Sequence, residues 1–309
     1  MVRKQRIAAL LGPTASGKTG LAGALRRRGL PIEVVGCDAL QIYRRLDAAT
    51  AKPSAQERRE VPYHLVDLVD PQEAMDAGRY VKLAEAAFAS IAKAGSWPMM
   101  VGGTSLYYRS VVRGLADIPT VSPQTRAGLA REHEERGAEA MYTELQAVDP
   151  EYAAITPAKN RQRVLRALEV QRTTGRPFSA FHREHQQRED RWACLTVILE
   201  PERSWLTRRI EERVAEMVPR LLEEVEALLA SGLSAQAPAM SALGYRDAVA
   251  VVSGQASRHG LEERLATAHR QYAKRQRTSL RGVEGALRIE VVDEAAVEAV
   301  AQALRRWFD

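Results

Sequence analysis

The fold of this chain is decided by the stretch Ile7-Ala8-Ala9-Leu10-Leu11-Gly12-Pro13-Thr14-Ala15-Ser16-Gly17-Lys18-Thr19. An apolar run typical of a buried strand ends at Gly12, and a helical pattern begins at Leu21. Between them lies the spacing Gly-x-x-x-x-Gly-Lys-[Ser/Thr], which forms a phosphate-binding loop in a strand–loop–helix context. The motif therefore predicts a diphosphate or triphosphate ligand, but it does not determine the reaction.

Each part of the loop has a physical role. Its glycines let backbone N–H groups face phosphate oxygens, and the helix N-terminus adds a partial positive charge. Lys18 supplies a mobile cation, and the Thr19 hydroxyl is placed to ligate Mg²⁺. We expect the phosphates to be bound by the whole loop, that is by Gly12, Pro13, Thr14, Ala15, Ser16, Gly17, Lys18 and Thr19.

Strands and helices alternate in the first third of the chain. We expect strands at 6–11, 32–36 and 98–104, a short strand within 62–71, and a helix over 79–94. This alternation predicts a parallel sheet with helical crossovers, whose ligands bind at the carboxyl ends of the strands. Gly12, Asp38 and Thr104 all follow strands, so we expect them to meet in one cleft.

Residues 122–190 interrupt the pattern because they are polar, helical and poor in strands. The sheet is expected to resume at 193–199. The later predictions are a long amphipathic helix over 204–230 that is broken near Pro219, a helix over 261–281, a strand over 287–292 and a final helix up to Phe308. The predicted fold class is α/β: a P-loop NTPase-like core with a parallel sheet flanked by helices (1–115 and 192–309), plus an inserted all-helical domain (116–191).

The amino-acid composition indicates which broad class of protein this is. A chain of 309 residues with 45% hydrophobic and 27% charged residues is typical of a soluble globular protein. Its two cysteines have no metal-ligand or disulfide spacing, so we expect both to be buried in a reducing cytoplasm. No apolar run is long enough to span a membrane, and no signal-peptide pattern follows Met1. The sequence predicts a cytoplasmic protein.

The positive charge is concentrated in two stretches. The chain carries a formal net charge of +6. Residues 159–191 hold nine lysines and arginines against four acids, and residues 270–288 hold six against one, so each is +5. Helical spacing puts Arg270, Lys274, Arg277 and Arg281 on one face, and Lys159, Arg163 and Arg166 on another. Two acid-poor stripes favour binding of a nucleic-acid backbone.

Two further residues carry open interpretations. Asp38, at a strand end opposite the loop, could bind Mg²⁺, accept a proton or cap a turn. The strand that ends at Gly102-Gly103-Thr104 lacks the acid that most P-loop phosphotransferases need there, which argues against kinase chemistry. Arg213, taken alone, is typical of surface charge.

The chain resembles the bacterial tRNA dimethylallyltransferases (tRNA isopentenyltransferases) in order along nearly its whole length. The matching blocks are Gly12 to Thr19; Asp38-Ala39-Leu40-Gln41-Ile42-Tyr43-Arg44 with Thr50-Ala51-Lys52-Pro53; Val61-Pro62-Tyr63-His64-Leu65 with Asp70-Pro71; Val101-Gly102-Gly103-Thr104 with Leu106-Tyr107; Arg163 with Arg166-Ala167-Leu168-Glu169-Val170; Thr174-Gly175-Arg176-Pro177; Leu243-Gly244-Tyr245-Arg246; and Tyr272-Ala273-Lys274-Arg275-Gln276. The chain departs from the family pattern at Ala39 (usually serine), His269 (usually threonine) and Ser279-Leu280 (usually two aromatics).

The resemblance implies transfer of a dimethylallyl group from dimethylallyl diphosphate to the exocyclic amine of the adenosine 3′ of a tRNA anticodon. Lys18, Arg213 and Mg²⁺ near Thr19 would neutralise the leaving diphosphate. Asp38 would accept the amine proton, and Thr104 would help to place a substrate.

The resemblance also implies a surface for the tRNA anticodon stem-loop, and we expect the enzyme to act as a monomer. The target base must leave its stack, and the inserted domain would hold the stem-loop. The expected tRNA contacts are Asp38, Ala39, Leu40, Gln41, Thr104, Arg126, Gln162, Arg163, Val164, Leu165 and Arg166.

Three alternatives remain open from the sequence. A small-molecule kinase would hydrolyse or transfer from ATP. A related transferase acting on free AMP or ATP would have little need of a basic inserted domain. A noncatalytic RNA-binding module would not need an intact phosphate loop.

Overall fold

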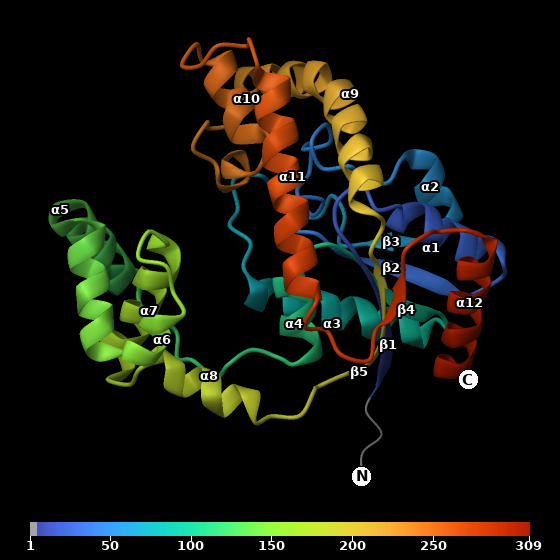
Figure 1. Cartoon of the computed structure of the whole chain (residues 1–309), viewed down its shortest axis with the longest axis horizontal. Helices are drawn as coiled ribbons and strands as arrows, with labels where there is room; N and C mark the ends of the chain where they lie inside the picture. Colours follow the sequence, from blue (N-terminus) through green and yellow to red (C-terminus); the bar gives the residue numbers. More distant parts are fainter. Residues whose placement is uncertain (1–4) are drawn as a thin grey trace. The chain divides into compact units, whose positions relative to one another are not determined.

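The structure, a computed structural model, describes residues 5–309 and divides into two compact units. The first combines the described residues up to Val112 with Arg191–Asp309, and the second is Arg113–Asp190. The first unit is built on a sheet, whereas the second is helical throughout its described elements (Figure 1).

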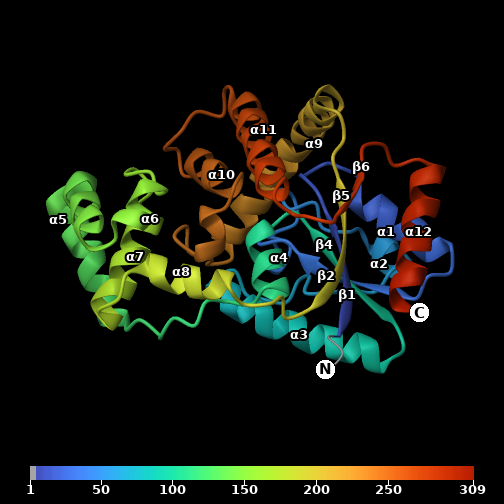
Figure 2. The ribbon, with the colours of Figure 1, turned by 60° about the horizontal axis from the view of Figure 1, so that its bottom comes forward.

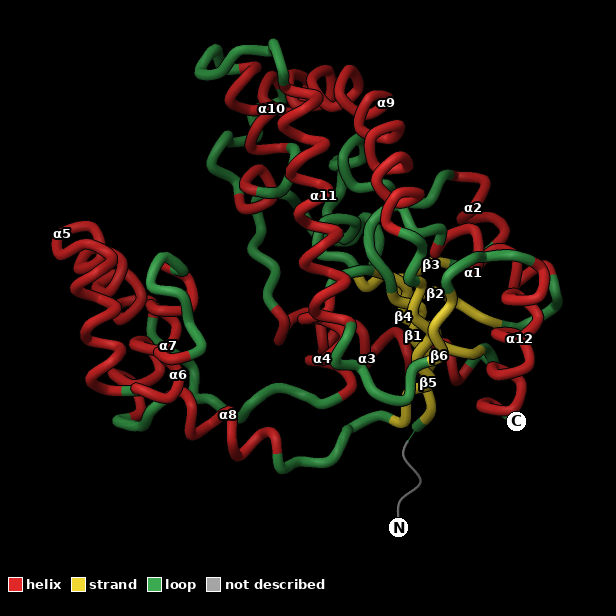
Figure 3. The backbone as a smooth tube through the Cα atoms, viewed as in Figure 1, coloured by secondary structure: helices red, strands yellow, loops and turns green. Residues whose placement is uncertain are grey.

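Six strands of the described chain form one parallel sheet in the order β3-β2-β4-β1-β5-β6 (Figure 3). The strands are β1 Arg6–Leu11, β2 Ile32–Cys37, β3 Tyr63–His64, β4 Trp97–Gly102, β5 Ala193–Leu199 and β6 Leu287–Ile289. The predicted parallel sheet is confirmed. The last strand is shorter than the predicted 287–292.

Helices cover both faces of the sheet (Figure 2). They are α1 Lys18–Arg27, α2 Ala55–Glu60, α3 Ala77–Lys93, α4 Ser105–Val112, α9 Arg203–Ala230, α10 Tyr245–Val252, α11 Leu261–Leu280 and α12 Glu294–Phe308, with a 3₁₀ turn at Pro238–Ser241. Alternate residues of β1 enter two different cores: Ile7 packs with α3, α4 and α9, whereas Ala8 packs with α1 and α12. Because both faces are buried, the strand is continuously apolar.

The prediction that the 204–230 helix is interrupted near Pro219 is wrong, although α9 changes direction part-way along its length (Figure 1). The helix α9 runs from Arg203 to Ala230 with Pro219 inside it (Figure 1). Proline removes one intrahelical hydrogen bond, at a cost of about 3 kcal/mol. Met217, Val218 and Leu221 around it are buried in the core, and this burial outweighs the cost.

The second unit contains α5 Pro123–Val148, α6 Pro150–Ala154, α7 Arg161–Thr174 and α8 Phe178–Gln186. The helix α5 is kinked at Gly137, whose φ of 81° and ψ of 167° are not helical. A separate apolar core holds these helices together, and the buried Asp149 carboxylate accepts the N–H groups of Tyr152 and Ser179. Across residues 5–309, the helices are all too short or too polar to cross a membrane.

Candidate active site

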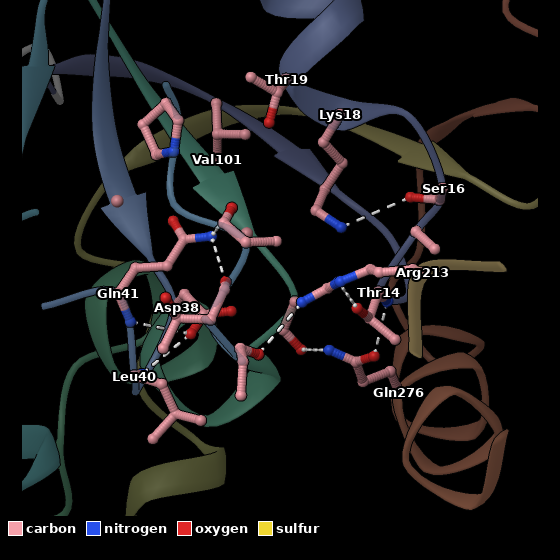
Figure 4. A pocket seen from close by; sticks show the side chains of 18 of the residues that line it. Thr14, Ser16, Lys18, Thr19, Asp38, Leu40, Gln41, Val101, Arg213 and Gln276 are labelled. Atoms are coloured by element: carbon pink, nitrogen blue, oxygen red, sulfur yellow. Dashed lines mark hydrogen bonds between the residues drawn. The ribbon is translucent and has the colours of Figure 1, made fainter. Parts of the chain in front are cut away.

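Three adjacent strands deliver the predicted polar residues to one edge of the sheet. The strands β2, β4 and β1 are neighbours, and Gly102 of β4 pairs with both Cys37 and Leu11. The phosphate loop, Asp38 and the Gly103 turn directly follow them and line one cavity of about 530 Å³. Sequence segments almost a hundred residues apart therefore share a single pocket (Figure 4).

The phosphate loop has the backbone that the motif requires. Gly17 precedes α1 with a φ of 91°, in the left-handed region that favours glycine, and Ala15 also has a positive φ of 63°. The Lys18 ammonium group donates to the carbonyl oxygens of Pro13 (2.7 Å) and Gly12 (3.1 Å). Burial is the main cause that lowers the pKa of Lys18 to about 8, although the Asp38 carboxylate opposes the shift. The loop presents a cation to an anionic ligand.

This pKa gives a pH prediction for anion binding. Below about pH 8 Lys18 is charged and attracts a diphosphate; above it the lysine of the free protein is neutral, so binding has to take up a proton. The affinity for inorganic diphosphate should then fall by at most about tenfold per pH unit. We expect this fall in the wild type and not in Lys18→Met, measured by calorimetric titration from pH 6.5 to 9.5. Because both proteins bind the same ligand, the ionisation of diphosphate itself affects both titrations equally. Identical slopes of log affinity against pH for the two proteins would contradict the prediction.

Arg213 reaches the loop from the opposite wall. From α9 its guanidinium group donates to the Thr14 hydroxyl at 2.7 Å and to the Ala49 carbonyl oxygen at 3.1 Å. Burial lowers the pKa of Arg213 below its usual value, with the Asp38 carboxylate opposing the shift. Arg213 is thus a partly buried cation beside Lys18, unlike the surface charge that its local sequence suggests.

Asp38 is held by the start of its own loop. Its Oδ1 atom accepts the backbone N–H groups of Leu40 (2.9 Å) and Gln41 (3.3 Å) (Figure 4). These bonds fix the carboxylate and leave its Oδ2 atom without a protein hydrogen bond among the described residues. The Thr104 hydroxyl accepts the N–H group of Ala39 at 3.1 Å, so the β2 and β4 ends are joined beside the carboxylate.

Thr19 and Asp38 are the side chains that fit a cation here. The Thr19 hydroxyl lines the cavity and makes no hydrogen bond to a described residue. Residues 5–309 contain no cluster of three or more His, Cys, Asp or Glu side chains that could hold a metal by themselves. Mg²⁺ is commonly bound by one or two protein oxygens together with substrate phosphates and water. The donor set therefore suits a magnesium ion that arrives with a diphosphate.

Three side chains of α11 line the same cavity and were not predicted individually: His269, Tyr272 and Gln276. Their spacing puts them on one helix face, and this polar periodicity was the available signal. His269 is buried, its Nε2 atom has no hydrogen-bond partner within residues 5–309, and burial lowers its pKa to about 4. It is a neutral imidazole at neutral pH.

The helical unit holds the remaining candidate residues. Val164 is packed in its core, so its side chain is not available to a ligand. Arg126 and Arg166 both contact Glu169, at 3.7 and 3.1 Å. Gln162 and Arg163 are exposed, Leu165 is half-buried, and Arg163 has no ion pair among the described residues.

The predicted cationic stripes are partly neutralised. Arg270 of α11 pairs with Glu211 and Glu263, and Arg172 of α7 pairs with Glu132 and Glu144. Lys159 lies before α7, whose N-terminal cap is Asn160, and so it is not on that helix as predicted. Of the cysteines, Cys37 is buried as predicted, whereas Cys194 is only partly buried.

Known proteins resemble this chain over nearly its full length. A family model described as IPP transferase matches residues 41–282. The tRNA dimethylallyltransferase of Halorhodospira halophila is 44% identical over 287 residues, which cover 92% of each chain. That of Geobacter metallireducens is 41% identical over 90% of each chain. The crystal structure of the tRNA isopentenylpyrophosphate transferase of Bacillus halodurans matches with a TM-score of 0.72 and 29% identity over 98% of this chain and 96% of that chain.

Proposed function

The chain belongs to the IPP transferase family, and on this basis we propose that it transfers the dimethylallyl group of dimethylallyl diphosphate to the exocyclic amine of the adenosine 3′ of the anticodon in tRNA, with release of diphosphate. The observation that carries the proposal is one cavity that contains a phosphate loop, two partly buried cations and a fixed carboxylate. A diphosphate leaving group and a proton acceptor are the two elements this reaction needs.

The phosphate loop holds the diphosphate of the donor. As the amine nitrogen forms its bond to the allylic carbon, the C–O bond breaks and its electron pair stays on the diphosphate. Lys18 and Arg213 stabilise that growing negative charge, and they act strongly because both are withdrawn from water. Bound Mg²⁺, held by the Thr19 hydroxyl, would add positive charge at the same oxygens.

Asp38 takes the proton that the attacking amine loses. Its Oδ1 atom is occupied by the Leu40 and Gln41 N–H groups, which leaves Oδ2 to accept the proton. The bond from Ala39 to Thr104 keeps the carboxylate close to the Gly103 turn. Thr104 lies beside this carboxylate, and in the proposed reaction it helps to place the adenine.

The chemistry is tested by mass analysis of tRNA nucleosides. Unmodified tRNA is incubated with the protein, Mg²⁺ and dimethylallyl diphosphate, then digested and analysed beside parallel reactions on free AMP and ATP. We expect adenosine in tRNA to gain one dimethylallyl group and the free nucleotides to gain none. Modification of AMP alone would favour the free-nucleotide transferase, and consumption of ATP would favour a kinase.

Arg163 tests the role of the helical unit in tRNA binding. It is exposed and unpaired among the described residues, whereas Arg166 shares Glu169 with Arg126. If Arg163 contacts a phosphate, Arg163→Ala should weaken binding of all substrate tRNAs by similar factors. It should also reduce, by roughly one unit, the slope of log binding constant against log salt concentration. Arg166→Ala should have a smaller effect, because Glu169 already neutralises part of its charge.

The measurement is a tRNA titration at several salt concentrations, with turnover at saturating tRNA as the control. Turnover should change less than affinity does, since Arg163 has no assigned role in proton transfer. Unchanged affinity and slope in both variants would remove this surface of α7 from the tRNA interface.

A further inference from the structure

Gln276 bridges two loops of the active site through one buried side chain. It lies near the C-terminal end of α11 and is 5% exposed. Its Nε2 atom donates to the Gly103 carbonyl oxygen at 3.0 Å, and its Oε1 atom accepts the backbone N–H group of Thr14 at 2.9 Å (Figure 4). Both ends of the amide are therefore used, each on a different strand end of the sheet.

Each of the two loops carries groups assigned to a different substrate. On the phosphate-loop side, the Thr14 hydroxyl also accepts a hydrogen bond from Arg213, which contacts the diphosphate in the proposed reaction. On the other side, Gly103 precedes Thr104, whose hydroxyl accepts the Ala39 N–H group next to Asp38. Gln276 thus connects the part of the site that holds the leaving group with the part that receives the amine.

The close contact between Gly103 and Gln276 tolerates few substitutions at either residue. A Cβ atom added to Gly103 would lie 2.1 Å from the Gln276 Nε2 atom, so the turn can approach the amide this closely only as glycine. Asparagine would be one methylene too short to reach both partners. Glutamate, when ionised, could accept from Thr14 but could not donate to the Gly103 carbonyl. The bridge therefore needs an amide of glutamine length.

The bridge also uses an amide of the phosphate loop itself. The Thr14 N–H group donates to Gln276, so the first part of the loop is oriented by α11 before any phosphate arrives. An interaction made in advance of binding reduces the ordering that the reaction has to supply. Because Gln276 also fixes where this loop lies relative to the Gly103 turn, we expect its loss to act on the rate more than on the affinity.

We propose that Gln276 is a positioning residue that fixes the phosphate loop and the Gly103 turn at one separation, and so sets the distance between the allylic carbon and the attacking amine. This inference rests on the proposed function, because it assigns the two loops to the donor and the acceptor. Gln276 touches neither reacting atom; it acts through Thr14 and Gly103. A displacement of reacting groups by about 1 Å is enough to lower a rate on the order of a hundredfold.

The test compares Gln276→Met with the matched control Gln271→Met, an exposed glutamine on the same helix. Methionine keeps the length and lacks both hydrogen bonds. We expect Gln276→Met to lower kcat by about tenfold to a hundredfold, with KM for dimethylallyl diphosphate and for tRNA changed by less than about threefold. Gln271→Met should match the wild type in all three constants.

We divide each measured rate by the concentration of sites that bind inorganic diphosphate. A variant that is partly unfolded then has fewer sites but does not show a falsely low kcat. A purely structural role would lower the number of competent sites and the melting temperature but leave kcat per site unchanged, and that result would overturn the proposal. A change in KM alone would overturn it as well.

Gln276→Glu provides a second readout if the methionine variant does not fold. A protonated glutamic acid can donate to Gly103 and accept from Thr14, whereas the carboxylate cannot donate. The ratio of its kcat to that of the wild type should therefore rise as the pH falls from 8 to 6. A ratio independent of pH, with kcat near that of the wild type, would refute the bridge. An inactive wild type would instead refute the proposed function, independently of Gln276.

Discussion

Asp38→Asn is expected to lower kcat by about 10²- to 10⁴-fold while tRNA still binds. Asparagine keeps an oxygen for the Leu40 and Gln41 N–H groups, so the loop stays in place and only the proton acceptor is lost. Single-turnover rates on bound tRNA isolate the chemical step from product release. Near-normal rates would reject Asp38 as the base.

Asp38→Ala separates the two functions of this carboxylate. Alanine removes both the base and the acceptor for the two N–H groups, so the loop over 38–41 loses its anchor. Its tRNA affinity should fall below that of Asp38→Asn, whereas its rate should fall by a similar factor. Equal tRNA affinities would show that the two backbone bonds do not order the loop.

Arg213→Ala has the second large expected effect, a loss of about 10²- to 10³-fold in kcat. The substitution removes a partly buried positive charge from the leaving diphosphate and leaves the Thr14 hydroxyl without its donor. Inorganic diphosphate should also bind more weakly. Arg213→Lys keeps the positive charge but lacks the planar guanidinium group with its several N–H donors, so it should recover only part of the rate.

Arg220→Ala is the matched control, because Arg220 is an exposed arginine two turns further along α9. It should behave as the wild type does in both rate and diphosphate binding. If Arg213→Ala and Arg220→Ala behave alike, Arg213 is only a structural contact to Thr14 and Ala49.

Local sequence was sufficient for features that depend on neighbouring residues. The loop from Gly12 to Thr19 is defined by spacing alone, since its glycines, lysine and hydroxyl act within one turn of the chain. The strands were predictable because burial on both faces leaves an uninterrupted apolar run. Their alternation with helices also predicted the parallel sheet, and thus the meeting of Asp38 and the Gly103 turn with the loop.

The sequence could not reveal partners that come from distant segments. Counting charges along residues 159–191 suggested a free basic surface, but Arg172 is paired with Glu132 and Glu144 of a different helix. Pro219 suggested a broken helix, because the apolar contacts that outweigh its cost become visible only in the packed core.

By itself, then, the sequence determined the phosphate loop, the alternating α/β core and the resemblance to a family, because each depends on order and spacing along the chain. Only the tertiary structure decided the roles of Arg213 and Gln276. Each lies on a helix more than 190 residues from Thr14, and each contacts it across the cavity. Such contacts depend on how α9 and α11 pack over the sheet, and burial of apolar surface far from the site fixes that packing.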